Sequence, residues 1–549
     1  MSRLADSIRR NGFLLAALAI AGAAALVYFL LILGQTGGRF IYNLDDAYIH
    51  LAIAKHIVRD GVYGVTPYGF SASSSSILWP LLLAGALALL GNREILPLLI
   101  NLAVAGTFIA VLYREWANGV KNPRWAFGML IGWMVFLPFG PILFNGMETM
   151  LQALSAVAFS AAAVRYLSGD GKGRLLSLCL LAALCAAVRY EGCFIAAAVC
   201  LLLILRGRWK AAALVGLSAA LPVVLFGAFS MSQGWSFLPN SLLIKHSSVV
   251  WTDPVSLWNM AARSFQPVTD IDSIHLPVWQ SLAVLLLGML LLRARSNGRI
   301  SIWDARVLPA VLFLLIAVMH SMWITVEMFF RYQAYLNALG IWAIGCLGAP
   351  AVDWKIFRRN VAAAAAGISA AILMAIPLGV LGFQALWKTP VASRNIWQQQ
   401  YQMGLFLNEY YPQAAVAAND IGAIDYLADL HLVDLFGLAS REVLRAKLGG
   451  EWQRDLAGAL DRLTSAEGAR IAVIYDNWFG YTPAAGRASV PLGWVRVADW
   501  TIPGNVVCGG ATVTWYALLP EEAGPLRAAL EAFSEKLPEE VIVRFFDTP

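Results

Sequence analysis

The stretch Tyr42–Trp79, YNLDDAYIHLAIAKHIVRDGVYGVTPYGFSASSSSILW, is the part of the chain around which the rest is organised. It places charged and aromatic residues between two strongly apolar segments. Asp45 and Asp46 come shortly after the first long apolar run, and isoleucines then recur at every fourth position from residue 49 to residue 57. This pattern predicts a short amphipathic helix at a membrane surface, with two carboxylates at its start.

Helix capping explains only one residue of the acidic pair. One carboxylate, Asp45 or Asp46, can cap the helix and favour its positive N-terminal end. Two adjacent carboxylates at a bilayer rim repel each other, so the second requires a cation, a proton or a reacting group nearby. The pair therefore predicts a functional role for at least one of the two.

Composition defines the class of protein. Hydrophobic residues make up 59% of the 549 residues and charged residues only 13%, and apolar runs long enough to span a membrane recur as far as residue 387. This composition is typical of a polytopic α-helical membrane protein. The net charge of +6 comes from Lys and Arg in short loops between apolar runs, which is a topology signal and excludes nucleic-acid binding as the explanation.

Charge also predicts the orientation. The first apolar run, residues 13–33, has a basic flank and is too long for an ordinary signal peptide, so it is expected to be an uncleaved span with a cytoplasmic N-terminus. Segment 77–91 is short and is expected to enter the membrane only in part. The expected spans number about eleven: 13–33, 95–113, 125–143, 148–164, 175–188, 193–205, 211–230, 278–292, 307–325, 334–349 and 360–386.

Two domains follow from this reading. Residues 1–387 form the membrane domain, with outer-face loops at 34–76 and 231–278, and an odd number of spans places the C-terminus outside. Residues 388–549 change character: AVAANDIGAIDYLADLHLVDLFG predicts strand, helix and strand, RIAVIYDN a strand, EEAGPLRAALEAFSEKL a helix and VIVRFFD a last strand. This part is expected to be an extracytoplasmic soluble α/β domain.

Charged and polar residues from at least five separated segments fall on the outer face. They are Asp45, Asp46, Glu148, Arg189, Glu191, Asn240, Lys245, His246, Arg331 and Tyr332. Each alone has an ordinary explanation, because Glu148 can cap the following helix and Arg189 can neutralise Glu191. Their convergence favours chemistry in which a carboxylate deprotonates an acceptor hydroxyl while a cation holds a phosphate leaving group.

The donor expected from the residues is a lipid. No Walker-type loop or dinucleotide glycine pattern is present, since GDGKG at 169–173 lacks the spacing of a P-loop. A lipid-phosphate-linked sugar that enters sideways from the bilayer fits an outer-face site better than a nucleotide sugar does.

The motifs DDAYIHLAIAKHI, SASSSSILWPLLLA, NGMETML, RYEG, FLPNSLLIKHS, FRYQ and ANDIGAIDYLADLHLVDLFGL together resemble the type C glycosyltransferases, integral membrane enzymes that use polyprenyl-phosphate sugars. The likeness covers roughly residues 40–440 and is strongest to the terminal arabinofuranosyltransferases of mycobacterial cell-wall synthesis and their bacterial relatives. SASSSSILW and RYEG depart from the forms common in those relatives, which leaves the sugar and the acceptor undefined.

The resemblance implies specific roles. Asp45 or Asp46 is the catalytic base, and Asp45 is favoured because Asp46 is better placed to open the helix. Arg189, Lys245 and Arg331 are expected to bind the donor phosphate. The substrate-binding candidates are Glu148, Glu191, Asn240, His246 and Tyr332. Asp45, Asp46 and Glu148 are the oxygen ligands available to Mg²⁺ or Mn²⁺ if a divalent cation takes part.

The function expected is therefore an inverting glycosyltransferase of the bacterial cytoplasmic (inner) membrane, active in cell-wall biogenesis. It would move an arabinofuranosyl- or mannosyl-type sugar from polyprenyl phosphate to a glycan, lipid or protein hydroxyl. Two alternatives remain: a secondary transporter or flippase of a lipid or sugar, and a non-catalytic membrane assembly subunit. Charges at one rim and a large outer domain favour the enzyme over a transporter, which should show paired repeats and broken helices meeting at mid-membrane.

Overall fold

The structure is a computed structural model. It describes residues 2–120, 123–136, 138–169, 174–245, 268–270, 273–275, 278–297, 301–323, 329–348, 361–480 and 489–547. Two regions are distinguished below: a helical region, residues 2–396, and a sheet region, residues 397–547.

Apolar helices make up most of the helical region. Their bounds are α1 Ser2–Gln35, α2 Asp46–Asp60, α3 Leu78–Leu90, α4 Leu96–Val120, α5 Pro123–Phe136, α6 Phe139–Phe144, α7 Thr149–Ser168, α8 Leu175–Val188, α9 Gly192–Leu205, α10 Trp209–Ser232, α11 Asn240–Lys245, α13 Val278–Asn297, α14 Leu308–Trp323, α15 Ala334–Leu347 and α17 Val361–Ile396. Two short strands, β1 Val268–Asp270 and β2 Ser273–His275, pair with each other.

The lengths of these helices identify a multi-pass membrane protein. Among the described residues, four stretches are long and apolar enough to cross a bilayer: Asn11–Gln35, Leu96–Ala117, Thr149–Ser168 and Trp209–Ser232. Six shorter apolar helices, among them α3, α8, α9 and α15, accompany them. α3, at 13 residues, is too short to cross a bilayer alone, as expected of segment 77–91.

The helices differ from the expectations in two places. The span expected over 125–143 is divided into α5 and α6, with Pro138 directly before α6, where proline ends a helix because it lacks the backbone N–H. α2 begins at Asp46 but is not a surface helix with one apolar face, because residues around its whole circumference from Ala47 to Ala54 are buried. It is packed between α3 and α19, a helix of the sheet region at Gly422–Leu427.

The sheet region follows α17 without a break, since that helix continues past residue 387 into a π-helix at Trp397–Tyr401. Its helices are α18 Gln402–Tyr410, α19 Gly422–Leu427, α20 Arg441–Leu448, α21 Glu451–Arg454, α22 Leu456–Ala466 and α23 Ala523–Ser534, with 3₁₀ turns at Asp476–Phe479 and Pro520–Glu522. Its strands are β3 Ala415–Ala418, β4 His431–Asp434, β5 Ile471–Ile474, β6 Val495–Thr501, β7 Thr512–Ala517 and β8 Ile542–Phe545.

The six strands form one mixed sheet in the order β4-β3-β5-β7-β6-β8. β4, β3 and β5 are parallel, and the other neighbours are antiparallel. The strand–helix–strand unit predicted from AVAANDIGAIDYLADLHLVD is confirmed as β3, α19 and β4, because a parallel pair requires a crossover of this kind. The parallel strands direct their carboxyl ends to one edge of the sheet.

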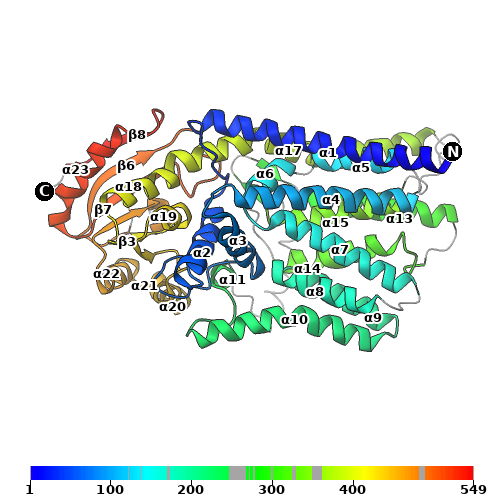
Figure 1. The fold of residues 1–549 in the computed structure, drawn as a ribbon, viewed down its shortest axis with the longest axis horizontal. Coiled ribbons are helices and arrows are strands. Elements are labelled where there is room, and N and C mark those ends of the chain that lie inside the picture. Colours follow the sequence, from blue (N-terminus) through cyan, green and yellow to red (C-terminus); the bar gives the residue numbers. More distant parts are fainter. Residues whose placement is uncertain are drawn as a thin grey trace.

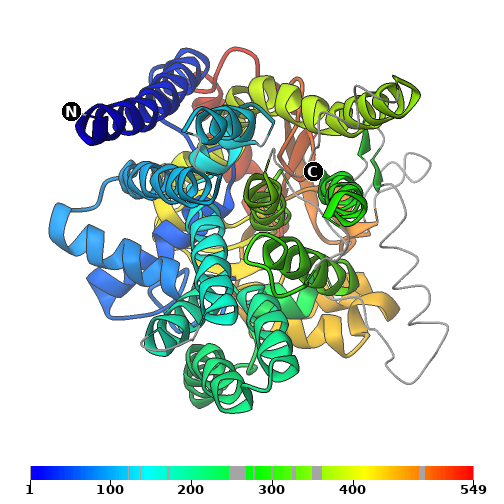
Figure 2. The same ribbon diagram turned by 90° about the vertical axis from the view of Figure 1, so that its right-hand side faces the viewer.

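The two regions lie end to end. In Figure 1 the helices of the helical region run along the long axis, and the sheet region covers the end where α2 and α3 lie. The N-terminus and the turn between α9 and α10 lie at the opposite end. Figure 2, seen from that opposite end, shows the bundle in front of the sheet. This arrangement places the carboxyl ends of the parallel strands against the acidic start of α2.

Candidate active site

A cavity of about 130 Å³ lies where the two regions meet. The helical region contributes the start of α2, the serines before α3, Met147 and Arg331 to its lining. The sheet region contributes residues that follow β3, β4 and β5. The predicted acidic pair therefore lies in a cavity between the two regions.

The side chain of Asp45 binds the sheet region and does not cap α2. Its two carboxylate oxygens accept hydrogen bonds from the backbone N–H groups of Gly422, at 2.7 Å, and Ala423, at 2.8 Å. These amides begin α19, so the carboxylate satisfies N–H groups that have no partner within that helix. The capping role predicted for the pair is thus found on α19, while α2 has no side-chain cap.

Lys55 binds the other end of α19. Its Nζ donates to the carbonyl oxygens of Asp425, at 3.1 Å, and Tyr426, at 2.9 Å, and lies 3.2 Å from Oδ1 of Asp429. A negative side chain at the N-terminus of α19 and a positive one at its C-terminus both suit the helix dipole. The start and middle of α2 together hold α19, and with it the sheet region, over the cavity.

Asp46 differs from Asp45 in exposure and partner. Its side chain is 33% exposed and forms an ion pair with Nη1 of Arg331, whose own side chain is buried. Burial opposes the charge of Arg331, but the Asp46 carboxylate outweighs it and raises the pKa of the guanidinium. Both side chains line the cavity, so a carboxylate and a cation face the same space.

The backbone before Arg331 is strained. Phe329 has φ 47° and Phe330 has φ 64°, in the left-handed region of backbone conformation that residues other than glycine rarely adopt. Such residues cost of the order of 1–3 kcal/mol each and persist where their surroundings determine the conformation. Here the result is that the Arg331 guanidinium contacts Asp46, Met147 Sδ at 3.3 Å and the Tyr332 hydroxyl at 3.2 Å.

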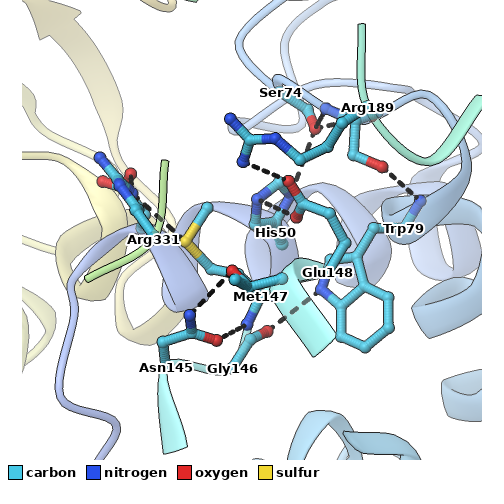
Figure 3. A network of polar contacts seen from close by, with 12 residues as sticks. His50, Ser74, Trp79, Asn145, Gly146, Met147, Glu148, Arg189 and Arg331 are labelled. Carbon is cyan, nitrogen blue, oxygen red and sulfur yellow. Dashed lines mark hydrogen bonds and ion pairs between the residues drawn. The ribbon is translucent and has the colours of Figure 1, made fainter. Parts of the chain in front are cut away.

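Arg189 joins Glu148 and Glu191 in a buried ionic cluster. Figure 3 shows its contact with Glu148. Its Nη1 lies 2.8 Å from Glu148 Oε1 and its Nη2 lies 2.9 Å from Glu191 Oε1. Glu148 does not cap α7 through its side chain, so that ordinary explanation is wrong. Arg189 pairs with Glu191, as expected. Arg189 is not among the residues that line the cavity.

His50 connects this cluster to the cavity. Its Nε2 lies 3.6 Å from Glu148 Oε2, and its Nδ1 lies 3.3 Å from the Ser74 hydroxyl (Figure 3). Burial lowers the pKa of His50 even though the Glu148 carboxylate opposes the shift. The imidazole is therefore neutral at pH 7; it contacts the Ser74 hydroxyl and lies close to Glu148 without a hydrogen bond to it.

The remaining predicted residues lie in different places. Asn240 is buried and its Nδ2 donates to the carbonyl oxygens of Gly437, at 3.1 Å, and Leu438, at 3.0 Å, so it ties α11 to the loop after β4. The ring of Tyr332 lies 5.5 Å from the Arg189 guanidinium and 4.9 Å from that of Arg331. Lys245 ends α11, but its side chain and the whole of His246 lie outside the described residues.

The sequence reasoning missed the residues from the sheet region. Asp420 follows β3 and accepts hydrogen bonds from Gln400 Nε2, at 2.8 Å, and the Tyr475 hydroxyl, at 3.3 Å. Burial, together with the charge of Asp420, raises the pKa of Asp45 well above its usual range. The signal was available, because Asn419 and Asp420 come directly after a strand of a parallel unit, where ligand sites gather.

The three carboxylates suggested for a divalent cation do not converge. Asp45 is directed at the amides of α19, Asp46 at Arg331, and Glu148 at Arg189. Among the described residues, no group of three or more His, Cys, Asp or Glu side chains is arranged to hold a metal ion. As a set, these residues do not fit Mg²⁺ or Mn²⁺.

The apolar helices, the α/β region at one end of them and the cavity between the two, which holds a carboxylate and an arginine, form a fold that is shared with a solved structure. Among solved structures, the chain is similar to the crystal structure of ArnT from Cupriavidus metallidurans bound to undecaprenyl phosphate, with a TM-score of 0.53 and 13% identity over 94% of this chain and 99% of that one. This likeness concerns the fold.

Two further comparisons are weaker. The single-particle cryo-EM structure of the arabinofuranosyltransferase AftD from mycobacteria aligns with a TM-score of 0.36 and 13% identity over 91% of this chain and 40% of that one. Residues 394–516 match the model of a domain of unknown function (DUF8728). No curated protein matches the sequence.

Proposed function

We propose that the protein is a membrane glycosyltransferase that moves a sugar from a polyprenyl-phosphate donor to an acceptor hydroxyl, with inversion at the anomeric carbon. The observation that carries this proposal is the pairing of Asp46 with Arg331 inside the cavity at the junction of the two regions. A transferase of this kind needs one group that takes a proton and one that holds a leaving phosphate, and these two residues supply both. The likeness in fold to ArnT, which was solved with undecaprenyl phosphate, is consistent with it.

In the proposed reaction, Asp46 and Arg331 each act on one group of the substrates. The carboxylate of Asp46 accepts the proton of the acceptor hydroxyl, whose oxygen forms a bond to the anomeric carbon of the donor sugar. The bond between that carbon and the phosphate oxygen breaks, and polyprenyl phosphate leaves with the electron pair. The guanidinium of Arg331 stabilises the charge that develops on the phosphate. A donor phosphate competes with Asp46 for Arg331, so donor binding would free the carboxylate for its task.

Asp46 is a better base than Asp45 on these contacts. Both oxygens of Asp45 already accept backbone N–H groups of α19, so they are less available to an acceptor hydroxyl. Asp46 is more exposed to the cavity. We therefore propose Asp46 as the general base in place of Asp45, which positions α19.

Arg331 is also the strongest candidate for the phosphate. Arg189 is already neutralised by Glu148 and Glu191 and would have to leave two buried carboxylates to meet a ligand. Lys245 stays a candidate, because Ser241 of the same helix α11 lines the cavity. Glu148, Glu191 and Asn240 would then support the site and not touch substrate.

We further propose that the membrane domain, residues 1–387, crosses the membrane about eleven times, and that residues 388–549 form an extracytoplasmic domain. The N-terminus and the α9–α10 turn lie at the end away from the sheet region (Figure 1), which suits a cytoplasmic location for the basic loops. In a bacterial cytoplasmic membrane the cavity would then open on the side where cell-wall polymers are assembled. Arabinofuranosyl and mannosyl donors are the first two to test.

The test is a transfer assay in lipid nanodiscs with synthetic polyprenyl-phosphate arabinofuranose and polyprenyl-phosphate mannose, using a cell-envelope extract as the acceptor. Mass spectrometry would follow release of polyprenyl phosphate and the mass of lipids that co-purify. We expect turnover of one donor, abolished in Asp46→Asn and kept in Asp60→Asn, a matched change at the other end of α2. A protein that carries no polyprenyl lipid and consumes neither donor would overturn the proposal.

A further inference from the structure

The wall of the cavity that faces the sheet region differs chemically from the wall around Asp46 and Arg331. Its described lining residues include Asn419, Asp420, Phe436 and Trp478, with no Lys or Arg among them. A phosphate would find no cation on this wall. Its aromatic rings, amide and carboxyl group are the kind of surface that binds a neutral, hydroxyl-rich ligand.

The position of this wall in the fold is that of a ligand site. Asn419 follows β3, Phe436 follows β4 and Trp478 follows β5, and these three strands are parallel neighbours. In open α/β sheets, ligands bind outside the carboxyl ends of the strands. All three residues line the cavity from this edge.

Trp478 is held in place with part of its ring uncovered. Its indole N–H donates to the carbonyl oxygen of Gly509 at 3.1 Å, and its ring centroid lies 5.1 Å from that of Phe436. A Cβ on Gly509 would lie 2.6 Å from the Trp478 ring, so only glycine lets the ring lie there. Because 38% of Trp478 stays exposed and its polar atom is already used, it offers an apolar face.

Asn419 supplies an unused hydrogen-bond donor beside that face. The residue is 4% exposed and its Oδ1 accepts the backbone N–H of Tyr475 at 3.1 Å, which fixes the amide. Its Nδ2 is buried and has no hydrogen-bond partner among the described residues. A buried amide donor without a partner calls for a ligand or water to complete it.

We infer that this wall is the acceptor subsite and that it binds a saccharide, with one sugar ring stacked on Trp478 and a ring hydroxyl hydrogen-bonded to Asn419. The inference rests on the proposed function, and it names the chemical class of the acceptor. Sugar rings combine an apolar C–H face with hydroxyls at the rim, which matches an aromatic face beside an amide and a carboxyl group. A cavity of about 130 Å³ is small for a ligand pocket, so it would enclose the terminal ring of a longer glycan.

The experiment is saturation-transfer difference NMR on the full chain in nanodiscs, with methyl glycosides of arabinofuranose, mannopyranose and galactopyranose as probes. We expect ring-proton signals for at least one glycoside. Trp478→Ala and Asn419→Ala should each weaken its binding about tenfold, the size of effect that removal of one anchoring contact produces. Trp478→Phe should keep part of the binding because it keeps an aromatic face, and Trp209→Ala, a change at an exposed tryptophan far from the cavity, should keep all of it.

Undecaprenyl phosphate provides the second measurement. Each variant should still be stabilised against heat by this lipid, which would show that the variant is folded and that the other wall is intact. No signal from any glycoside with the wild-type protein, or equal signals from wild type, Trp478→Ala and Asn419→Ala, would overturn the inference. Saccharide binding that is lost in these variants, in a protein that neither binds undecaprenyl phosphate nor consumes a donor, would support this subsite and overturn the proposed transfer.

Discussion

Asp45 accepts the backbone N–H of Gly422, a residue 377 positions further along the chain, through a carboxylate oxygen at 2.7 Å. This contact joins the first acidic residue after α1 to the first turn of α19. Asp46, its neighbour in sequence, is directed instead at Arg331. Asp45 therefore holds the two walls of the cavity together, and Asp46 faces the space between them.

The first prediction separates these two tasks. Asp46→Asn should reduce sugar transfer roughly a hundredfold to ten-thousandfold, the range typical of losing a general base, and it should also lower the melting temperature because the buried guanidinium of Arg331 loses its anion. Asp45→Asn replaces an acceptor oxygen by an amide that cannot accept an N–H, so it should cost roughly 1–3 kcal/mol of stability. Transfer rates and thermal unfolding of both variants in nanodiscs test this. Wild-type transfer by Asp46→Asn would remove Asp46 from the mechanism.

The second prediction concerns Gly422. A Cβ at this position would lie 2.2 Å from the Asp45 carbonyl oxygen and 2.6 Å from its carboxylate. Gly422→Ala should therefore push α19 away from α2 and destabilise the protein by roughly 1–3 kcal/mol, as overpacking does. Gly524→Ala, where nothing lies within 4 Å of the added methyl group, is the matched control in the same region. Equal melting temperatures for the two variants would contradict the close approach.

The third prediction distinguishes the two arginines. Arg189→Met leaves Glu148 and Glu191 buried without their cation, which typically costs about 3–5 kcal/mol, so the variant should unfold easily before any effect on transfer is measured. Arg331→Met should remain folded and lose the stabilisation that we expect undecaprenyl phosphate to give the wild-type protein. Thermal unfolding with and without the lipid measures both effects. A stable Arg189→Met variant that no longer responds to the lipid would return Arg189 to the phosphate site.

The fourth prediction is a pH dependence from Lys447. Burial, opposed by the charge of Asp434, lowers its pKa from the usual 10.5 to about 8. Between these values the unfolded chain binds more protons than the folded one, so Lys447 makes the free energy of unfolding rise with pH from about 8 to about 10. Lys447→Met removes the titrating group. The difference in stability between variant and wild type should change over this pH range and stay constant below pH 7; a constant difference throughout would contradict the shift.

Patterns local in sequence predicted much of this molecule. The apolar runs gave the helices, and alternation of short apolar segments gave β3, α19 and β4, because these features depend on neighbours along the chain. Motif order also brought Asp46 and Arg331 into one site. The sequence could not predict the partners of Asp45 and Asp46, because two adjacent carboxylates look alike in sequence. Only the packing of α19 on α2 decides which of them faces the cavity.

The sheet-region wall was missed for a related reason. Asn419 and Trp478 carry no charge pattern, and each is part of the site only because three parallel strands end at one edge. The burial of α2 on all sides could not be predicted either, because its apolar pattern is that of a surface helix. Its polar side is covered only when α19 packs on it.

The long separation between Asp45 and Gly422 has a consequence for biosynthesis. A ribosome completes the acidic start of α2 when most of the chain has yet to be made, and the amides that receive Asp45 appear only in the last quarter of synthesis. Until then the wall of the cavity that the sheet region contributes does not exist. In the proposed enzyme, transfer activity would therefore require α19 to dock on α2, and a chain truncated before residue 422 would lack it.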